Sequence, residues 1–534
     1  MSQPNAPPPE LIDLCSRVGT LLVYAVMTAA AVSIVRQMPG AKGRNLRRSR
    51  MFGRSESPEH GRLGKRVTGR RLALASLLAV AATVPALAQT SNSGAGIGPS
   101  QQVAQPRAET PAIKNVAPSV EHLLGDLGGL RTRLEDRGVY LLLDGITEFA
   151  GNVSGGTRKG ATFANQIALE ADIDWQRLAG ITGLSTHVIA VNRSGSNTSR
   201  LFGDNLLPVQ EIYGAGGNVA VHLVSAYAQW TASDRVLDIA VGRMNVENDF
   251  ASSPLYCNYM NNALCGDPKA LPAGDIGHSA YPDAAWAARA RARPTPSTYV
   301  QAGVYEVNQG LYSYANFRTG FKFDASQDSG VYVPVEVAYE PLVGADKMPG
   351  HYKVGFGYDS SSNFKDFATA LSATANTSTG TTLSTRTGNT QVWMLADQMV
   401  VRQGPGDVDG IILLGGFIHN DPNNSSYAEQ YFAGALDHGF WRARPKDTVG
   451  LLFSYNTVSG RLGKVQAREA ELGIPFSNSA TGVQRYEMIL EANYDIHVAP
   501  GLNFQPEFQY VFRPNAQSNI HDAAVLGFKA HVAF

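Results

Sequence analysis

Arginine alternates with alanine at the end of the segment Ala284–Arg293, AAWAARARAR. Successive side chains of a β-strand point to opposite faces, so Arg289, Arg291 and Arg293 share one face here and Trp286 lies on the other. A guanidinium donates hydrogen bonds in a planar fork, which can grip hydroxyl or carboxylate groups. Because a basic group at mid-bilayer costs about 2–4 kcal/mol, this arginine ladder predicts a face in contact with water rather than lipid.

Carboxylates recur on the polar face of other alternating segments, and acidic partners would hold the arginine ladder in place. A basic ladder that faces acids across a narrow throat would set up a transverse field, which orders water and favours dipolar polyhydroxy solutes over apolar ones. The alternative is that these charges pair along a wall and contact no solute. The carboxylates that we nominate are Glu170, Asp172, Asp174, Glu336, Glu487, Glu491 and Glu507.

Two cysteines, Cys257 and Cys265, lie eight residues apart in the stretch PLYCNYMNNALCGDP, which reads as a loop. Two cysteines are too few for a zinc site, and we predict no metal. In an oxidising compartment they would form a disulfide that staples the loop, and the alternative is two unpaired thiols. With Asn258, Asn261 and Asn262, the loop 244–283 would form an ordered polar constriction if it folds inward; otherwise it is a surface loop.

The end of the chain alternates as well: Leu526, Phe528 and Phe534 share one face, opposite Lys529 and His531. From residue 138 onward we find sixteen candidate strands of roughly 9–11 residues, the length that crosses a membrane at a tilt. Pro506 cannot donate to a ladder, so a bulge is expected there. The candidate strands are 138–149, 163–175, 183–193, 219–230, 236–243, 284–293, 298–307, 331–340, 350–358, 390–402, 410–419, 427–438, 447–456, 483–495, 501–512 and 523–534.

Long and short connections alternate between these strands. The long ones are 194–218, 244–283, 308–330, 359–389 and 457–482. Long outer loops, short inner turns and an even strand number, which brings both termini to one side, are typical of outer-membrane barrels. We therefore predict an all-β fold, a 16-stranded antiparallel transmembrane β-barrel over 138–534. Tandem soluble sandwiches are the alternative, but they leave unexplained the aromatic strand ends Trp175, Trp230, Trp286, Tyr339 and Tyr358.

The net charge of zero hides an uneven distribution. Residues 1–88 hold 13 basic and 4 acidic residues, which leaves 45 − 13 = 32 basic and 45 − 4 = 41 acidic residues in the remainder. A remainder of about −9 argues against nucleic acid as a partner, since phosphate binding needs clustered positive charge. The basic excess belongs to the targeting region.

The first 137 residues read as targeting and leader segments. Residues 69–88 have two arginines, an apolar core and Ala86-Leu87-Ala88, the pattern of a signal peptide for export through the inner membrane. Residues 1–68 are an N-terminal extension of doubtful status: translation starts at Met51, or the apolar run 18–35 anchors a precursor. Residues 89–118 are expected to be a disordered leader, and Ser119 is expected to open a short periplasmic helix over 119–137.

The region 120–534 resembles the carbohydrate-selective porins of the OprB family. The resemblance rests on the order and spacing of several stretches, among them LEDRGVYLLLDGITEFAGN, VGRMNVENDF, NNALCGDP, QAGVYEVNQG, LADQMVVRQGPG and EANYDIHVAPGLNFQPEFQYVFRPNA. The Ser/Thr-rich insertion in 359–389 departs from the family, and so does RPNAQSN, which replaces the usual Asn-Pro-Gly corner.

The resemblance implies a narrow charged channel in the bacterial outer membrane for passive diffusion of glucose and related monosaccharides or polyols. Inward Tyr305 or Tyr332 would then offer a flat surface to a sugar ring. The expected partners are outer-membrane lipid, carbohydrate solutes and the barrel-assembly machinery, which would read the Phe534 segment; no cofactor is implied. Monomer and homotrimer both stay open, and so does the particular sugar.

Three other functions compete with this one. A structural or adhesive barrel would need a plugged lumen, whereas the inward charges on many strands argue for water inside. A general non-selective porin for ions and small solutes is the nearer alternative, and current blocked by sugar would distinguish the two. An enzyme in the barrel would need a placed nucleophile and base. His222 and Ser225 have no persuasive spacing, and the sequence offers no acid to complete such a set, so we predict no enzyme activity.

Overall fold

A computed structural model describes residues 121–534, apart from 205, 214–217, 266–280, 313–319, 322, 363, 371–374, 377–379 and 382. These residues all belong to one of the two units into which the chain divides, Ala88–Phe534. The predictions of an N-terminal extension, a signal peptide and a disordered leader concern residues outside the described set.

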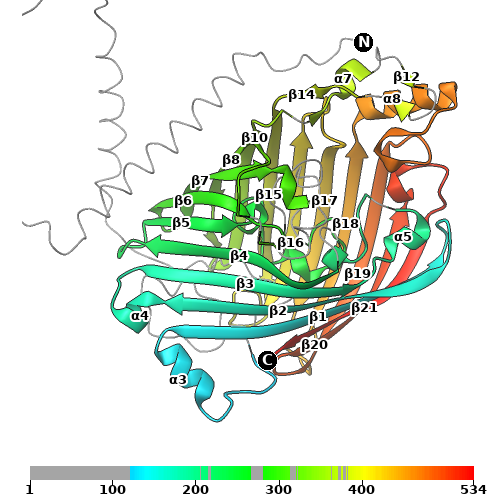
Figure 1. Cartoon of the computed structure of the whole chain (residues 1–534). Helices are drawn as coiled ribbons and strands as arrows, with labels where there is room; N and C mark the ends of the chain where they lie inside the picture. The colour runs from blue at the N-terminus through cyan, green and yellow to red at the C-terminus, as the bar shows by residue number, and fades with distance from the viewer. Residues whose placement is uncertain are drawn as a thin grey trace, which may run out of the picture. The chain divides into compact units, whose positions relative to one another are not determined.

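Sixteen long strands form one closed antiparallel barrel, which confirms the predicted fold (Figure 1). Each strand pairs with the next long strand of the chain, and β1 pairs with β21 to close the wall, with Phe149 opposite Phe528. The strands are β1 (Val139–Ser154), β2 (Gly160–Asp174), β3 (Leu184–Gly195), β4 (Val219–Thr231), β5 (Leu237–Met244), β6 (Ala285–Thr295), β7 (Thr298–Asn308), β8 (Asp328–Tyr339), β10 (Met348–Asp359), β15 (Asn389–Arg402), β16 (Gly410–Asn420), β17 (Tyr427–His438), β18 (Thr448–Val458), β19 (Tyr486–Ala499), β20 (Leu502–Phe512) and β21 (Ala523–Ala533).

Alternation in the sequence gives the wall two different faces, as β18 illustrates. Leu451 and Phe453 point outward and are about half exposed, at 50% and 42%. Ser454 and Asn456 point inward and are fully buried. An apolar outer face and a polar inner face are what a barrel in lipid requires, because lipid offers no partner to a polar side chain.

The two ends of the barrel differ in their connections. The end that holds Phe534 has short turns with α4 (Trp175–Ala179) and β9 (Leu342–Val343); we call it the turn end. The opposite end, the loop end, has longer connections. They contain α5 (Ser199–Phe202), η2 (Glu211–Tyr213), η3 (Val246–Asn248), η4 (Tyr256–Asn258), η6 (Gln309–Tyr312), β11 (Phe364–Lys365), α7 (Phe367–Ala370), β12 (Ala375–Asn376), β13 (Gly380–Thr381), β14 (Thr385–Arg386), α8 (Gly460–Leu472), η7 (Ser477–Ser479) and η8 (Pro514–Ala516). Within the described part of the chain, no helix has the length and apolar character needed to cross a membrane.

The predicted helix before the barrel is shorter than expected. It is α3 (Leu130–Asp136), and the residues before it, 123–129, form turns instead of helix. Gly125, Gly128 and Gly129 have positive φ angles of 58°, 69° and 86°, which a right-handed helix does not allow. The helix in the structure therefore covers only the second half of the range 119–137. Ser119, expected to open it, lies outside the described residues.

The bulge expected at Pro506 is absent. Pairing of β19 with β20 is interrupted between Asn493 and Ile496, opposite Pro506, and resumes in the same register. Pro506 removes one N–H from the ladder but inserts no extra residue, so the strands stay aligned. The shift in register lies nearer the turn end, between His497 and Ala499.

Two segments from the loop end enter the barrel and pack against its inner wall. Residues 245–265, here called the inward loop, follow β5, and Phe250, Tyr256 and Tyr259 pack on wall residues such as Trp393. Residues 197–212, the second inward segment, pack Phe202, Leu207 and Val209 against Ile489 and Val511 of the wall. The apolar core of this membrane protein therefore lies between its loops and the inner face of the barrel.

Candidate functional site

The arginine ladder lies on the inner face of β6. Arg289 forms ion pairs with Asp238 of β5 and, at 3.1 Å, with Asp249 of the inward loop. Its guanidinium also donates to Gln229 of β4 at 3.1 Å. With 4% of its side chain exposed, Arg289 joins the wall to the inward loop and leaves little surface for a solute.

The other two arginines lie nearer the turn end. Arg291 donates to Gln301 at 2.8 Å and lies 4.9 Å from the centre of the Tyr299 ring. Arg293 forms an ion pair with Glu340 at 2.7 Å and lies 5.2 Å from the same ring. The ion-pair partners of the ladder, Asp238, Asp249 and Glu340, are thus acids that the sequence analysis did not nominate.

Glu336, a nominated acid, is a buried anchor for the inward loop. Its carboxylate accepts hydrogen bonds from the backbone N–H of Ala251 at 2.9 Å and from the indole of Trp393 at 2.8 Å. It also accepts from Tyr299 at 2.8 Å and Gln301 at 2.9 Å, so the residues beside the arginines hold it as well. These four uncharged donors stabilise the buried carboxylate, and none of the four is an arginine.

Two of the three nominated acids of β2 lie together, and the third lies apart from them. Asp172 lies 2.5 Å from His187 of β3, and both are buried. Asp174 caps α4 by accepting from the backbone N–H groups of Gln176 and Arg177 at 2.9 and 3.2 Å. Glu170 is half-buried on the same face and lies beside Asp172. Asp174 thus stabilises a helix at the turn end. The alternation of residues could not distinguish this position from one that lines the channel.

Cys257 and Cys265 form a disulfide, with their Cα atoms 4.4 Å apart. We call residues 257–265 the disulfide ring. Glu491 of β19 accepts hydrogen bonds from the ring's Met260 and Asn261 N–H groups at 2.7 and 3.0 Å. This nominated acid therefore binds backbone, and the ring lies against the wall that carries β19.

Side chains of neighbouring strands hold the same ring through its carbonyl groups. Lys529 of β21 donates to the carbonyls of Cys257 and Tyr259 at 2.9 and 3.1 Å. Asn493 and Gln505 both donate to the carbonyl of Asn258, at 3.0 and 3.1 Å. Because the inward loop is also held at Arg289 and Glu336, it crosses the interior from β5–β8 to β19–β21.

Glu507 and Glu487, the remaining nominated acids, lie towards the second inward segment. Glu507 accepts from Gln509 at 2.7 Å, and Gln509 in turn donates to the carbonyl of Val209 at 2.9 Å. Glu487 is fully buried at the loop end of β19, beside Asp204 of the second inward segment. Burial raises the pKa of Asp204 to about 6.

Two tyrosines proposed as a surface for a sugar ring do not have that role in this structure. Tyr305 and Tyr332 point inward, but they are 0% and 1% exposed because the inward loop covers them. Their hydroxyls donate to Asp249 at 3.0 Å and to Gln391 at 2.8 Å. The prediction of an open aromatic surface at these two positions is wrong.

An acid that the sequence did not reveal lies near His222. The ring nitrogen Nε2 of His222 lies 3.3 Å from Asp283. Both His222 and Ser225 are fully buried inside the wall at β4. This arrangement offers no accessible nucleophile.

Several residues that hold the loops were not nominated. Lys529 was visible in the sequence, since it lies on the polar face of the last strand, but nothing there indicated its partners. Asp249 gave no signal, because it follows a strand in a region with no periodicity. Asn493, Gln505 and Gln509 share the parity of Glu491 and Glu507 and could have been found by extending the rule from acids to amides.

Comparison with known proteins extends these observations. The model of the family described as carbohydrate-selective porin, OprB family, matches residues 158–534. Porin B of Pseudomonas aeruginosa is 28% identical over 441 residues, which cover 79% of this chain and 93% of that protein. The putative porin QuiX of Acinetobacter baylyi is 26% identical over 426 residues, which cover 77% and 93%.

A solved structure is similar as well. The high-pH structure of Pseudomonas putida OprB has a TM-score of 0.70 and 29% identity, and the match covers 78% of this chain and 99% of that one. Fold and family together place the barrel in the bacterial outer membrane, with the turn end in the periplasm, and they are those of a channel rather than of an enzyme class. The family match extends from the turn after β1 to the last residue, and on that ground this chain belongs to the carbohydrate-selective porins of the OprB family.

Proposed function

We propose that this porin lets glucose and related monosaccharides or polyols diffuse passively through a narrow charged channel. The observation that carries the proposal is the inward loop, which is held at Arg289 and Glu336 on one side and at Glu491 and Lys529 on the other. A sixteen-stranded barrel is wide enough for a water-filled channel, so what crosses its interior decides which solutes pass.

The chemistry of the interior supports a polyhydroxy solute. The inner face carries amides, carboxylates and guanidiniums, and the three arginines of the ladder, Glu336 and Glu491 are paired or hydrogen-bonded. A neutral solute rich in hydroxyl groups can exchange its hydrogen bonds to water for hydrogen bonds to such a surface, whereas an apolar solute cannot. The family description, carbohydrate-selective porin, agrees with this class of solute.

Liposome swelling would test the proposal. Purified porin in vesicles should admit hexoses and pentitols quickly, disaccharides more slowly, and amino acids and organic acids of similar size more slowly than hexoses. Protein-free vesicles and vesicles with heat-denatured porin are the controls. Equal rates for all solutes of one size would instead favour the general porin.

Ion current gives a second and independent measurement. Added hexose should reduce the current through a single channel, because a sugar that binds in the narrow part displaces ions there. A current that ignores hexose would contradict a sugar-binding channel, while a large open channel with equal swelling rates would support the alternative.

We further propose that residues 69–88 direct export and are removed, and that assembly machinery reads the segment ending at Phe534. The mature protein should begin near Gln89, which N-terminal sequencing would test; a start upstream of Arg70 would contradict cleavage at this site. Deleting Phe534 should reduce the amount of barrel in outer-membrane fractions, and normal insertion would contradict the second proposal.

A further inference from the structure

A band of aromatic side chains crosses the outer wall near the loop end. Phe417 and Tyr431 have ring centres 4.9 Å apart, Tyr431 and Tyr455 6.4 Å, and Tyr455 and Tyr486 5.4 Å. They lie on four successive strands, β16–β19, and Tyr486 is the first residue of β19. Aromatic bands of this kind mark the boundary between lipid tails and headgroups.

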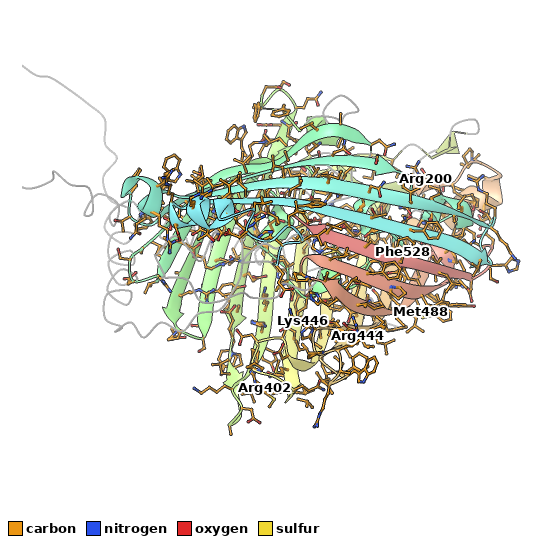
Figure 2. All side chains as sticks on the ribbon, turned by 90° about the horizontal axis from the view of Figure 1, so that it is seen from below. Arg200, Arg402, Arg444, Lys446, Met488 and Phe528 are labelled. Carbon is orange, nitrogen blue, oxygen red and sulfur yellow. A yellow bond between two sulfur atoms is a disulfide. The ribbon has the colours of Figure 1, made fainter. Side chains whose placement is uncertain are left out.

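Basic side chains continue this boundary on the neighbouring strands. Arg485 directly precedes Tyr486, and the guanidinium of Arg513 lies 4.4 Å from the centre of the Tyr486 ring. The turn between β1 and β2 carries Arg158 and Lys159, and α5 carries Arg200. We call these five residues the outer basic patch. Figure 2 labels Arg200 near the loop end of the wall that carries Phe528 and Met488.

Backbone hydrogen bonds hold the loops of the patch together. The N–H of Arg158 donates to the carbonyl of Leu201 at 2.9 Å, which joins the β1–β2 turn to α5. Gly156 donates to His521 at 2.9 Å, and Arg485 donates to Ala516 at 2.8 Å. The patch therefore extends over adjoining loops from β19, across the seam between β21 and β1, to β3.

Four of the five side chains have charged groups that are not held by other described residues of the protein. Arg158, Lys159, Arg200 and Arg485 are exposed, and among the described residues their charged groups make no ion pair or hydrogen bond. A nearby acid, Asp522, accepts from the backbone N–H of Arg513 at 2.9 Å. By contrast, Arg468 on α8 is paired with Glu471 at 2.7 Å. The patch thus presents uncompensated positive charge at headgroup height.

We propose that the outer basic patch binds the phosphate groups of a phosphorylated glycolipid in the outer leaflet of the outer membrane. Guanidinium groups match the geometry of phosphate, and clustered basic residues beside a membrane surface attract anionic headgroups. Below the patch, Phe163, Val153 and Leu526 are about half exposed on the lipid-facing wall, where the acyl chains of the same lipid would lie. One lipid can therefore contact the apolar outer wall and the outer basic patch at the same time.

Titration of the purified, full mature porin in detergent with diphosphorylated lipid A would test this. Wild type should bind the lipid, and the triple variant R158Q/K159Q/R200Q should bind about 10- to 100-fold more weakly, because three headgroup contacts are lost. The matched control K365Q/R461Q/K464Q removes three basic side chains from other loops and should bind like wild type. Heat-modifiable migration on gels would show that all three proteins are folded barrels.

Two further binding measurements identify the ligand. Lipid A without phosphates should bind wild type as weakly as diphosphorylated lipid A binds the triple variant, and inorganic phosphate should not displace bound lipid A. The proposal is overturned if the triple variant binds lipid A like wild type, if the control variant loses as much affinity, if dephosphorylated lipid A binds equally well, or if inorganic phosphate displaces the lipid. Sugar swelling rates should be the same in all variants, so this test is independent of the proposed carbohydrate transport.

Discussion

The inward loop is held in two different ways at the two sides of the barrel. On the arginine side, around β5–β8, an ion pair between side chains joins the wall to the loop, Arg289 with Asp249 at 3.1 Å, in addition to the contact of Glu336 with the backbone N–H of Ala251. On the ring side, around β19–β21, side chains of the wall bind the backbone of the disulfide ring, as Glu491 does at 2.7 and 3.0 Å. The first arrangement depends on complementary residue types, and the second depends on a backbone held in one shape.

This difference predicts how each side fails. On the arginine side, the loss of one charge leaves its partner buried and unpaired, which is costly in a low dielectric. On the ring side, the loss of one side chain leaves small backbone dipoles, but loss of the ring's shape misaligns all the donors and acceptors together. Mutations on the two sides should therefore affect stability and conductance in different proportions.

The largest loss of stability is expected for Arg289→Gln. It leaves Asp238 and Asp249 without their cation, and breaking such a buried pair costs about 3–5 kcal/mol. Urea unfolding of the folded porin in detergent would measure it. Arg461→Gln, at an exposed position of α8, is the matched control and should change stability by less than about 0.5 kcal/mol. If Arg289→Gln unfolded at the same urea concentration as wild type, a large contribution of this ion pair to stability would be contradicted.

A smaller loss of stability with a larger change in conductance is expected for Cys257→Ser combined with Cys265→Ser. Closing a loop of this size stabilises a protein by about 2–3 kcal/mol through the unfolded chain. Without the disulfide the ring should leave the wall more often, so single-channel conductance and disaccharide swelling should both rise. Reduction of wild type with dithiothreitol should reproduce the variant, and the reductant should leave the double variant unchanged. Equal conductance before and after reduction would contradict a constricting role of the ring.

Glu491→Gln should cost less again, about 1–1.5 kcal/mol, because the hydrogen bonds to Met260 and Asn261 change from charge-assisted to neutral ones. Conductance should rise in the same direction as for the disulfide variant. Glu507→Gln, whose carboxylate accepts from Gln509 instead of the ring, is the comparison on the neighbouring strand. If Glu507→Gln raised conductance as much as Glu491→Gln, the effect could not be assigned to the contacts between Glu491 and the backbone of the ring.

The smallest effect is expected at Asp204, in the second inward segment, and it depends on pH. Burial raises its pKa from 3.8 to about 6 in the folded protein. An acid with a raised pKa stabilises the fold most below pH 4, and this contribution is lost as the pH rises through about 6. The difference between these two pKa values corresponds to roughly 3 kcal/mol, and the loss of stability should be a fraction of that energy.

Asp204→Asn should therefore flatten the pH dependence of unfolding between pH 4 and 7, because the amide cannot ionise there. Asp366→Asn, a change in another loop at the loop end, is the control and should keep the slope of wild type. If the stability of wild type fell more steeply towards low pH than that of Asp204→Asn, a raised pKa at Asp204 would be contradicted.

The wall could be read from the sequence because its rule is local. Each strand repeats every second residue, so the exposed Leu451 and the buried Asn456 were assigned to opposite faces without knowledge of any neighbour. The same rule gave the inward direction of Arg289, Arg291 and Arg293. It also included Asp174, which caps a helix, because alternation reports a direction and says nothing about distance along the barrel.

The loops followed no such rule. The spacing of the cysteines predicted a staple, but nothing in the sequence indicated that Glu491 and Lys529, more than 200 residues away, would hold it. Tyr305 and Tyr332 had the inward parity of channel residues, and the inward loop covers them. Which inner residues face solute is therefore decided by where the loops pack.

By itself, the sequence determined a closed wall with an apolar outside and a polar inside, because lipid and water select side chains of opposite character at every step along a strand. Tertiary structure alone decided the ion-pair partners of the arginines, the burial of the inward tyrosines and the path of the disulfide ring. The physical reason is that these depend on contacts between residues far apart in the chain, which form when the wall closes and the loops enter it.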